Sequence, residues 1–475
     1  MVKIVSIIEQ IGLGGGGKVT AVFNRMNLFA EYPNFEPVLL SLAHHPRFKN
    51  IFLELQSAGR IAPRVNFTTL PDACAPTATR NGTEANVDWP EYDCIIKKNK
   101  KQTYLRKNRT IMEERKTSTL AGELTRLKVT DKNNNFDALF LNGTIEVIKR
   151  KNEDNTDEIT DFSKGIPIRW VKSKGNTYIM GKNLITGKWY GNARPLTISF
   201  YEMISDDNCV TFFDGVTSHY LAATTQPPRV FFMHEDHLKE HGEFPPRIRH
   251  QIEKFMGEAI ITATSVQKKQ LEADCVPAAK IRVIPHVCEI EPAAKGQRNN
   301  LVTLSRLDRW GKPINECVDA FVTIMDEFPD VNYLIYGDGG ARNELENQIK
   351  RLDCGHRVKL MGYTTDPYSV FRGAIAAAYP TLTEGFGIAI LEALACGCPV
   401  ISYDVNYGPR ELIQSGVNGE LVRPGDIGSI SQAMRKVLKN PTPYQKATSK
   451  GLNRYSRKAY SKNYLNLIAE LMPIT

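Results

Sequence analysis

The chain has 475 residues, about three times the usual domain length, and 42% of them are hydrophobic, so two or three domains with full cores are expected. Its first eight residues are too short and too soon interrupted for a signal peptide or a membrane span, and its nine scattered cysteines indicate thiols rather than a disulfide framework. Both features favour a cytoplasmic protein.

The chain opens with the pattern of a doubly wound α/β domain. Residues 2–8 read as a strand, a glycine-rich loop follows, and residues 19–30 and 37–42 read as a helix and a second strand. The loop formally matches a dinucleotide fingerprint, Gly-x-Gly-x-x-Gly from Gly12 to Gly17. That fingerprint also needs an acidic residue after the second strand, where this chain has Ala43-His44-His45, so an NAD site is not expected.

A long insert interrupts this first domain between about residues 95 and 195. Its strand-like patches, 138–141, 145–149, 166–171 and 177–180, are separated by hairpin-type turns, which predicts an antiparallel β module. The insert holds 22 Lys and Arg against 11 Asp and Glu, whereas the whole chain is only +9. A run without acids from Lys97 to Arg109 predicts attraction to a polyanion, although a solvated surface is the plainer reading. No nucleic-acid motif accompanies the run.

After the insert, an apolar strand ends at His234-Glu235-Asp236-His237. The His-x-x-His spacing suggests zinc, but no third or fourth ligand lies nearby at a suitable spacing, so no metal site is predicted.

Residues 301–305, 331–336, 358–361, 375–379 and 400–403 read as the strands of a second α/β domain, separated by helices such as 314–327 and 341–352. Such alternation predicts a parallel sheet with ligands beyond the carboxyl ends of its strands. The segment from Ser305 to Lys312 follows the first of these strands and carries Arg306, Arg309 and Lys312. Two of these cations could hold a diphosphate and stabilise the charge that grows as a sugar leaves.

The most specific block runs from Thr383 to Ala393, a small-residue loop that opens into an amphipathic helix. Gly385 and Gly387 let the backbone approach a ligand, and the first N–H groups of the helix can bind a phosphate. Glu384 precedes the helix and Glu392 lies about two turns along it, so one carboxylate can reach a sugar and the other a ribose. The Cys-Gly-Cys that follows is read as a turn.

This block resembles the donor-site signature of retaining glycosyltransferases of the GT-B type, family 4. The resemblance implies that Arg306 and Lys312 grip the donor diphosphate, although Lys312 stands one residue later than the common spacing, which leaves Arg309 as a substitute. It also implies that Glu384 contacts the donor sugar, that Glu392 holds the ribose, and that His234 positions the sugar, with His237 behind it. The donor-binding residues expected on this basis are Gly16, Gly17, Arg306, Lys312, Glu384, Gly385, Phe386, Gly387, Ile388 and Glu392, with His234, Glu384, Arg306 and Lys312 as the catalytic group.

The insert, the His-x-x-His strand end, Asp214-Gly215 and Asn406-Tyr407-Gly408-Pro409 narrow the resemblance to one branch. That branch contains bacterial transferases that α-glycosylate polyol-phosphate wall teichoic acids, and catalytic subunits that add GlcNAc to Ser/Thr of serine-rich adhesins. The expected fold is α/β GT-B, two Rossmann-like doubly wound domains with a cleft between them and an antiparallel β insert. The expected boundaries are 1–94 with 196–296 for the N-terminal domain, 95–195 for the insert, 297–455 for the nucleotide-sugar domain, and 456–475 for a helix that crosses back.

The resemblance implies a UDP-sugar donor, UDP-GlcNAc or UDP-glucose, with no metal and no further cofactor. The expected acceptor is an anionic polymer or a Ser/Thr-rich protein, and the insert is expected to mediate homo-oligomers. No nucleic-acid partner and at most peripheral contact with the inner face of the membrane are expected. A UDP-sugar epimerase or phosphorylase on the same fold, and a catalytically silent partner subunit, are the alternatives. Retention of all five site side chains (His234, Arg306, Lys312, Glu384 and Glu392) argues against a silent subunit.

Overall fold

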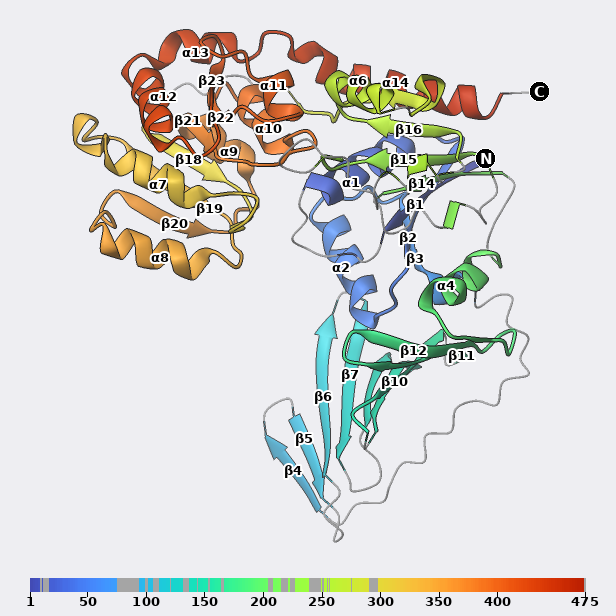
Figure 1. Cartoon of the computed structure of the whole chain (residues 1–475). Coiled ribbons are helices and arrows are strands. Elements are labelled where there is room, and N and C mark those ends of the chain that lie inside the picture. The colour runs from blue at the N-terminus through green and yellow to red at the C-terminus, as the bar shows by residue number, and fades with distance from the viewer. Residues whose placement is uncertain are drawn as a thin grey trace. The chain divides into compact units, whose positions relative to one another are not determined.

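The computed structural model (Figure 1) falls into two compact units. One comprises residues 1–15, 22–231 and 255–258, and the other comprises residues 16–21, 232–254 and 259–475. The structure describes residues 1–8, 11, 17–74, 94–98, 101–105, 111–119, 121–130, 136–142, 144–152, 154–163, 166–203, 208–214, 221–222, 227–238, 249, 252–253, 255, 257–274, 276–289 and 298–473.

The first α/β sheet has seven strands in the order β17-β16-β15-β14-β1-β2-β3. The pairings described within it are parallel, and its strands are rich in buried apolar residues, as expected for a sheet covered on both faces. Its strands are β1 (Val2–Ile8), β2 (Phe35–Ser41), β3 (Asn66–Thr69), β14 (Cys209–Phe213), β15 (Arg229–Met233), β16 (Ala259–Thr262) and β17 (Ile281–Val283). The accompanying helices include α1 (Gly17–Ala30), α2 (Pro46–Ser57), α3 (Leu70–Cys74) and α6 (Ser265–Ala273).

A buried arginine fixes α1 to this sheet. Arg25 is fully buried, donates to Ser6 Oγ on β1 at 2.5 Å, and forms an ion pair with Asp214 directly after β14. Its guanidinium also lies 4.3 Å from the ring centroid of Phe212. A buried charge with a paired carboxylate tolerates little displacement, so the middle of α1 is held near the carboxyl ends of β1 and β14.

The insert is a ten-stranded antiparallel sheet in the order β13-β12-β11-β10-β9-β8-β7-β6-β5-β4, and the predicted antiparallel insert is thereby confirmed. A small core of buried side chains lies within it: Leu127, Ala138, Ile145, Ile148 and Phe162. Its strands are β4 (Cys94–Lys98), β5 (Lys101–Leu105), β6 (Ile111–Thr119), β7 (Gly122–Thr130), β8 (Phe136–Leu141), β9 (Thr144–Lys151), β10 (Asp157–Ser163), β11 (Ile166–Lys174), β12 (Thr177–Asn183) and β13 (Trp189–Tyr190), and α4 (Ala193–Tyr201) follows.

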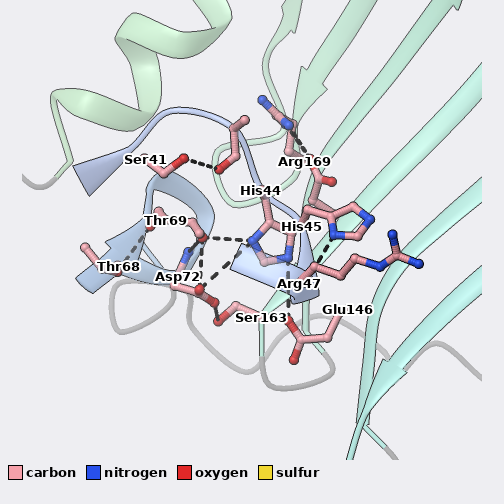
Figure 2. A network of polar contacts seen from close by, with 12 residues as sticks. Ser41, His44, His45, Arg47, Thr68, Thr69, Asp72, Glu146, Ser163 and Arg169 are labelled. Carbon is pink, nitrogen blue, oxygen red and sulfur yellow. Dashed lines mark hydrogen bonds and ion pairs between the residues drawn. The ribbon is translucent and has the colours of Figure 1, made fainter. Parts of the chain in front are cut away.

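A polar network joins the insert to the first sheet (Figure 2). His44, which follows β2, contacts Thr69 Oγ1 at 2.8 Å through Nδ1 and Glu146 Oε2 of β9 at 3.5 Å through Nε2. Asp72 of α3 accepts hydrogen bonds from Thr69 Oγ1 at 2.9 Å and from Ser163 Oγ of β10 at 2.7 Å. The base of the insert is therefore fixed by buried, directional contacts and not by apolar packing alone.

The second α/β sheet has six parallel strands in the order β20-β19-β18-β21-β22-β23. Its strands are β18 (Asn300–Leu304), β19 (Asn332–Tyr336), β20 (Val358–Gly362), β21 (Ala374–Tyr379), β22 (Val400–Tyr403) and β23 (Gly419–Val422). The helices are α7 (Ile314–Val322), α8 (Arg342–Arg351), α9 (Pro367–Gly373), α10 (Ile388–Ala395), α11 (Gly408–Leu412), α12 (Ile427–Lys439), α13 (Pro441–Ala447) and α14 (Arg457–Leu471). Buried residues of α7, α8, α12 and the strands form one core.

The two doubly wound parallel sheets and the antiparallel insert match the predicted fold class. In α14, Glu470 pairs with Arg282 of β17. The domain boundaries drawn from the sequence stay predictions. Among the described residues, no helix has both the length and the apolar composition needed to cross a membrane.

Candidate active site

The loop after β18 is shaped by Asp308. Its carboxylate accepts from the backbone N–H of Trp310 at 2.9 Å and of Gly311 at 3.4 Å, and these bonds with the nearby Arg306 guanidinium hold the Asp308 pKa below its usual value. Arg306 lies 2.9 Å from the same carboxylate but leaves 77% of its side chain exposed. The loop is therefore rigid at Asp308, while Arg306 extends into solvent.

Lys312, at the end of that loop, reaches the loop after β21. Its Nζ donates to Thr381 Oγ1 at 2.7 Å and forms an ion pair with Glu384. The backbone N–H of Leu382 also donates to the carbonyl of Gly311 at 3.1 Å. Lys312 and Glu384 keep only 20% and 24% of their side chains exposed, so the ion pair is partly shielded from solvent.

Arg309, the alternative cation, has a different partner. Its Nε donates to Glu344 of α8 at 2.9 Å. Arg309 and Lys312 both line a pocket of about 370 Å³ between the first turns of α7 and α8. The structure thus brings Lys312, and not Arg309, to Glu384. Whether either cation holds a diphosphate stays a prediction.

The N-terminus of α10 is built by close backbone approaches. Gly387 precedes the helix with φ of +85°, which favours glycine. A side chain at Gly385 would collide with the carbonyl oxygen of His234, so the strand end at β15 packs directly on this loop. A Cβ placed on Gly17 would lie 3.5 Å from Ile388 Cδ1, so the first residues of α1 and α10 are neighbours. The N-termini of α1 and α10 therefore lie side by side. The predicted Gly16 lies outside the described residues.

His234 and His237 have different surroundings. The half-buried His234 ring stacks on Phe232 with centroids 4.1 Å apart, and lies 6.1 Å from the ring of buried His286. The buried His237 contacts Asp274 Oδ2 at 3.4 Å through Nε2 and the Tyr407 hydroxyl at 3.3 Å through Nδ1. Burial lowers the His237 pKa, although Asp274 acts in the opposite direction. His237 is thus buried between Asp274 and Tyr407, and its expected place behind His234 stays a prediction.

Glu392 lies about one turn into α10, and burial raises its pKa to about 7. Nearby, the buried Tyr379 hydroxyl has no hydrogen-bond partner among the described residues. A carboxylate in this state carries its full charge only when a ligand or a higher pH favours the ionised form.

Four contacts were not foreseen from the sequence. Thr381 accepts from Lys312 and donates to the carbonyl of Thr383 at 2.9 Å, and the backbone N–H of Tyr407 donates to the carbonyl of Glu384 at 2.9 Å. His286 places its ring edge-to-face with Phe386, with centroids 4.9 Å apart. Of these residues, only Thr381 carries a sequence signal, because it directly follows a predicted strand beside Glu384. The described residues contain no group of three or more His, Cys, Asp or Glu arranged to hold a metal ion.

The family match to known proteins covers the part of the chain that contains the second α/β sheet. Residues 289–459 match the family model described as "Glycosyl transferases group 1". A poly(glycerol-phosphate) alpha-glucosyltransferase of Bacillus subtilis (strain 168) is 29% identical over 198 residues, which make up 40% of this chain and 29% of that protein. The chain therefore spans less than a third of this relative.

Solved structures extend the likeness over the whole chain. A crystal structure of an S. aureus TarM mutant in complex with fondaparinux, alpha-GlcNAc-glycerol and UDP has a TM-score of 0.85 at 19% identity, covering 98% of this chain and 99% of that one. The pneumococcal O-GlcNAc transferase GtfA, solved with UDP and GlcNAc, has a TM-score of 0.71 at 16% identity, covering 100% and 99%. The resemblance inferred from the sequence is confirmed: residues 289–459 form a group 1 glycosyltransferase domain, and the chain has the GT-B fold.

Proposed function

We propose that this protein is a retaining, metal-independent glycosyltransferase that moves GlcNAc or glucose from a UDP-sugar to a hydroxyl of a polyol-phosphate polymer. The observation that carries the proposal is the partly shielded Lys312–Glu384 ion pair beside the N-terminus of α10, in a domain that matches the group 1 model. A cation, a carboxylate and free helix N–H groups in one place suit a sugar diphosphate.

The diphosphate is held by cations and backbone dipoles. Lys312 exchanges part of its contact with Glu384 for a β-phosphate oxygen, and exposed Arg306 folds onto the same group. The N–H groups at Gly17 and at the start of α10 complete the cradle. These groups stabilise the charge that develops as the sugar leaves, the role a divalent ion has in other transferases.

The carboxylates and His234 orient the two ends of the donor. Glu384 accepts from sugar hydroxyls, Glu392 accepts from the ribose hydroxyls, and His234 positions the sugar. The bond between the anomeric carbon and the β-phosphate oxygen breaks while the acceptor oxygen bonds to that carbon on the same face. The leaving phosphate takes the acceptor's proton, so configuration is retained and no external base is needed.

The acceptor assignment draws on charge and on the relatives. The insert carries 22 Lys and Arg against 11 Asp and Glu, which suits a phosphodiester polymer. Lys97 and Lys98 lie on β4, and Lys98 pairs in register with Lys101 of β5. The B. subtilis relative is named for poly(glycerol-phosphate), and the TarM complex holds alpha-GlcNAc-glycerol.

Transfer of GlcNAc to Ser or Thr of a protein is the second candidate, because the GtfA structure shares this fold. The proposal also includes self-association through the insert. It places the protein in the cytoplasm, with at most peripheral contact with the inner face of the membrane. The sheet supports self-association by ending in the strand β4, whose outer edge can pair with another chain.

The test is a transfer assay with purified protein, UDP-GlcNAc or UDP-glucose, and poly(glycerol-phosphate), poly(ribitol-phosphate) or a Ser/Thr-rich peptide. We expect an α-linked sugar on one of the polymers, seen by NMR, at the same rate with EDTA present. A β-linked product would overturn retention, and activity lost in EDTA and restored by manganese would overturn the metal-free mechanism. Transfer to the peptide alone would favour the second candidate.

A further inference from the structure

The last part of the insert combines cations and aromatic rings without any acid. Residues 166–201 contain six Lys and Arg and no Asp or Glu, and they hold two of the four tryptophans of the chain. They form β11, β12, β13 and α4, which lie together at one end of the ten-stranded sheet (Figure 1). This segment is separate from the basic run 97–109, which begins on β4 and β5 at the other end of the sheet.

Strand register places the key side chains on one face. Trp170 of β11 pairs with Lys182 of β12, which pairs with Trp189 of β13, and directly paired residues face the same side of an antiparallel sheet. The two indole rings meet edge-to-face with centroids 5.5 Å apart, and Lys182 Nζ lies 5.0 Å from the Trp189 ring centroid. Met180 follows on the same face, because it lies two residues before Lys182.

These groups are open to solvent. Trp189 is 56% exposed and Met180 40%, and β13 is an edge strand. Large exposed apolar side chains grouped at one edge of a sheet mark a surface that binds a ligand or a partner. The cluster of indoles and lysine holds its own shape, so a ligand would meet a preformed platform.

Charge decides what kind of ligand suits the platform. Lys172, next along the sheet, lies 3.8 Å from Asp154 and 3.9 Å from Glu158, so its charge is compensated. Lys182 forms no ion pair with any carboxylate in the described part of the chain, and its Nζ lies over the Trp189 ring instead. The platform therefore offers an indole face and one ammonium group to an anionic ligand.

We propose that this platform, made of Trp170, Met180, Lys182 and Trp189, binds the stretch of polyol-phosphate polymer that already carries sugars. A pyranose packs its C–H face on the indole of Trp189, and the neighbouring phosphodiester lies against Lys182. The inference rests on the proposed function, since it takes the enzyme's own product as ligand. Binding of the product stretch keeps the chain on the enzyme between transfers.

The test separates this surface from the active site. Affinity of the full-length protein for chemically prepared, α-glycosylated poly(glycerol-phosphate) and for the bare polymer is measured by calorimetry, with no donor present. Trp189→Ala and Lys182→Ser are expected to weaken binding of the glycosylated polymer at least tenfold and of the bare polymer less than twofold. Lys174→Ser, an exposed lysine in the β11–β12 hairpin, is the matched control and should leave both affinities unchanged.

A second measurement uses turnover. Both variants should hydrolyse the donor at the wild-type rate but release shorter runs of modified repeats, because the product stretch no longer stays bound. Wild-type affinity of both variants for the glycosylated polymer would overturn the proposal. An equal loss of affinity for the bare polymer would also overturn it. So would binding of single-stranded RNA or anionic vesicles to the same platform more tightly than the glycosylated polymer. If the protein glycosylates no polyol phosphate, the proposed function is wrong. The affinities measured without donor still test whether the platform binds the glycosylated polymer.

Discussion

Lys312 and Glu384, which lie 72 positions apart in the chain, form an ion pair whose lysine also donates to Thr381 Oγ1 at 2.7 Å. In the proposed function each group holds the other in position for the donor, the ammonium for the phosphates and the carboxylate for the sugar. Because the pair is partly shielded, neither charge is strongly solvated, and a ligand that replaces one partner faces a small reorganisation.

We expect Lys312→Ala and Glu384→Gln each to lower the rate of sugar transfer at least about 10²-fold, the scale of removing one preorganised charged contact. Steady-state kinetics with saturating acceptor would measure this. Arg309→Ala is the matched control, because Arg309 donates to Glu344 instead, and it should retain most activity. A loss in Arg309→Ala as large as in Lys312→Ala would exchange the roles of the two cations.

The sequence was enough to foresee most of this second sheet. Its strands are short apolar runs between helices, so each can be read from local pattern, and the structure has β18, β19, β20, β21 and β22 within a residue or two of the predicted ranges. The pairing of Lys312 with Glu384 could not be read from spacing, because it depends on which loops meet beyond the sheet. The extra residue in the first loop left Arg309 as a substitute for Lys312, and the structure pairs Arg309 with Glu344.

Glu392 should give UDP binding a pH dependence. Burial raises its pKa to about 7, and ribose hydroxyls donate to its ionised form, so binding favours loss of its proton. Affinity for UDP should therefore fall about tenfold from pH 8 to pH 6, following the ionised fraction of Glu392. Calorimetry at several pH values measures this. Since UDP phosphates also titrate, Glu392→Gln shows their share, and an unchanged pH slope in that variant would remove Glu392 from the effect.

His44 should make the stability of the folded protein depend on pH. Burial lowers its pKa, but Glu146, Asp161 and Asp72 together outweigh this and raise the pKa above its usual value. When a group has a higher pKa in the folded than in the unfolded protein, its contribution to stability is fully present at pH values below the unfolded pKa. This contribution is lost as the pH rises through the folded pKa. Urea unfolding of the wild type should thus show stability falling as pH rises above 6.5.

His44→Gln tests the assignment, because glutamine keeps a hydrogen-bonding side chain without the titration. Its unfolding free energy should be lower at pH 6 and much flatter with pH. The neighbouring His45, whose pKa is lowered by burial and by Arg47, makes His45→Gln a control for a histidine outside the carboxylate cluster. If His45→Gln flattens the profile and His44→Gln does not, the contacts of His44 with Thr69 and Glu146 in Figure 2 are not the source.

The insert is the part of the fold that the sequence predicted least completely. Four strands were predicted from alternation and hairpin turns, matching β8, β9, β11 and β12, but the structure has ten strands. The strands β4, β5, β6, β7 and β10 are rich in Lys, Arg, Asp and Glu, so their apolar alternation is diluted. Cross-strand pairs such as Arg126 with Asp137, and Lys149 with Asp157, stabilise them instead, and such pairing is invisible to a local pattern.

The basic run at the far end of the insert gives the last prediction. If the acceptor is a polyanion, Lys97, Lys98, Lys100 and Lys101 bind its ground and transition states alike, so they lower the apparent KM without changing the chemistry. Replacing all four with Ser should raise KM for a polyol-phosphate polymer and flatten the dependence of KM on salt, because fewer counterions are released on binding.

The matched control replaces four exposed lysines elsewhere, Lys446, Lys450, Lys458 and Lys462, and so removes the same charge. Donor hydrolysis without acceptor should stay at the wild-type rate in both quadruple variants. If both raise KM equally, only the net charge of the protein matters and the run has no particular role. If neither raises it at any salt concentration, the run is a solvated surface, and a neutral Ser/Thr-rich peptide becomes the better acceptor.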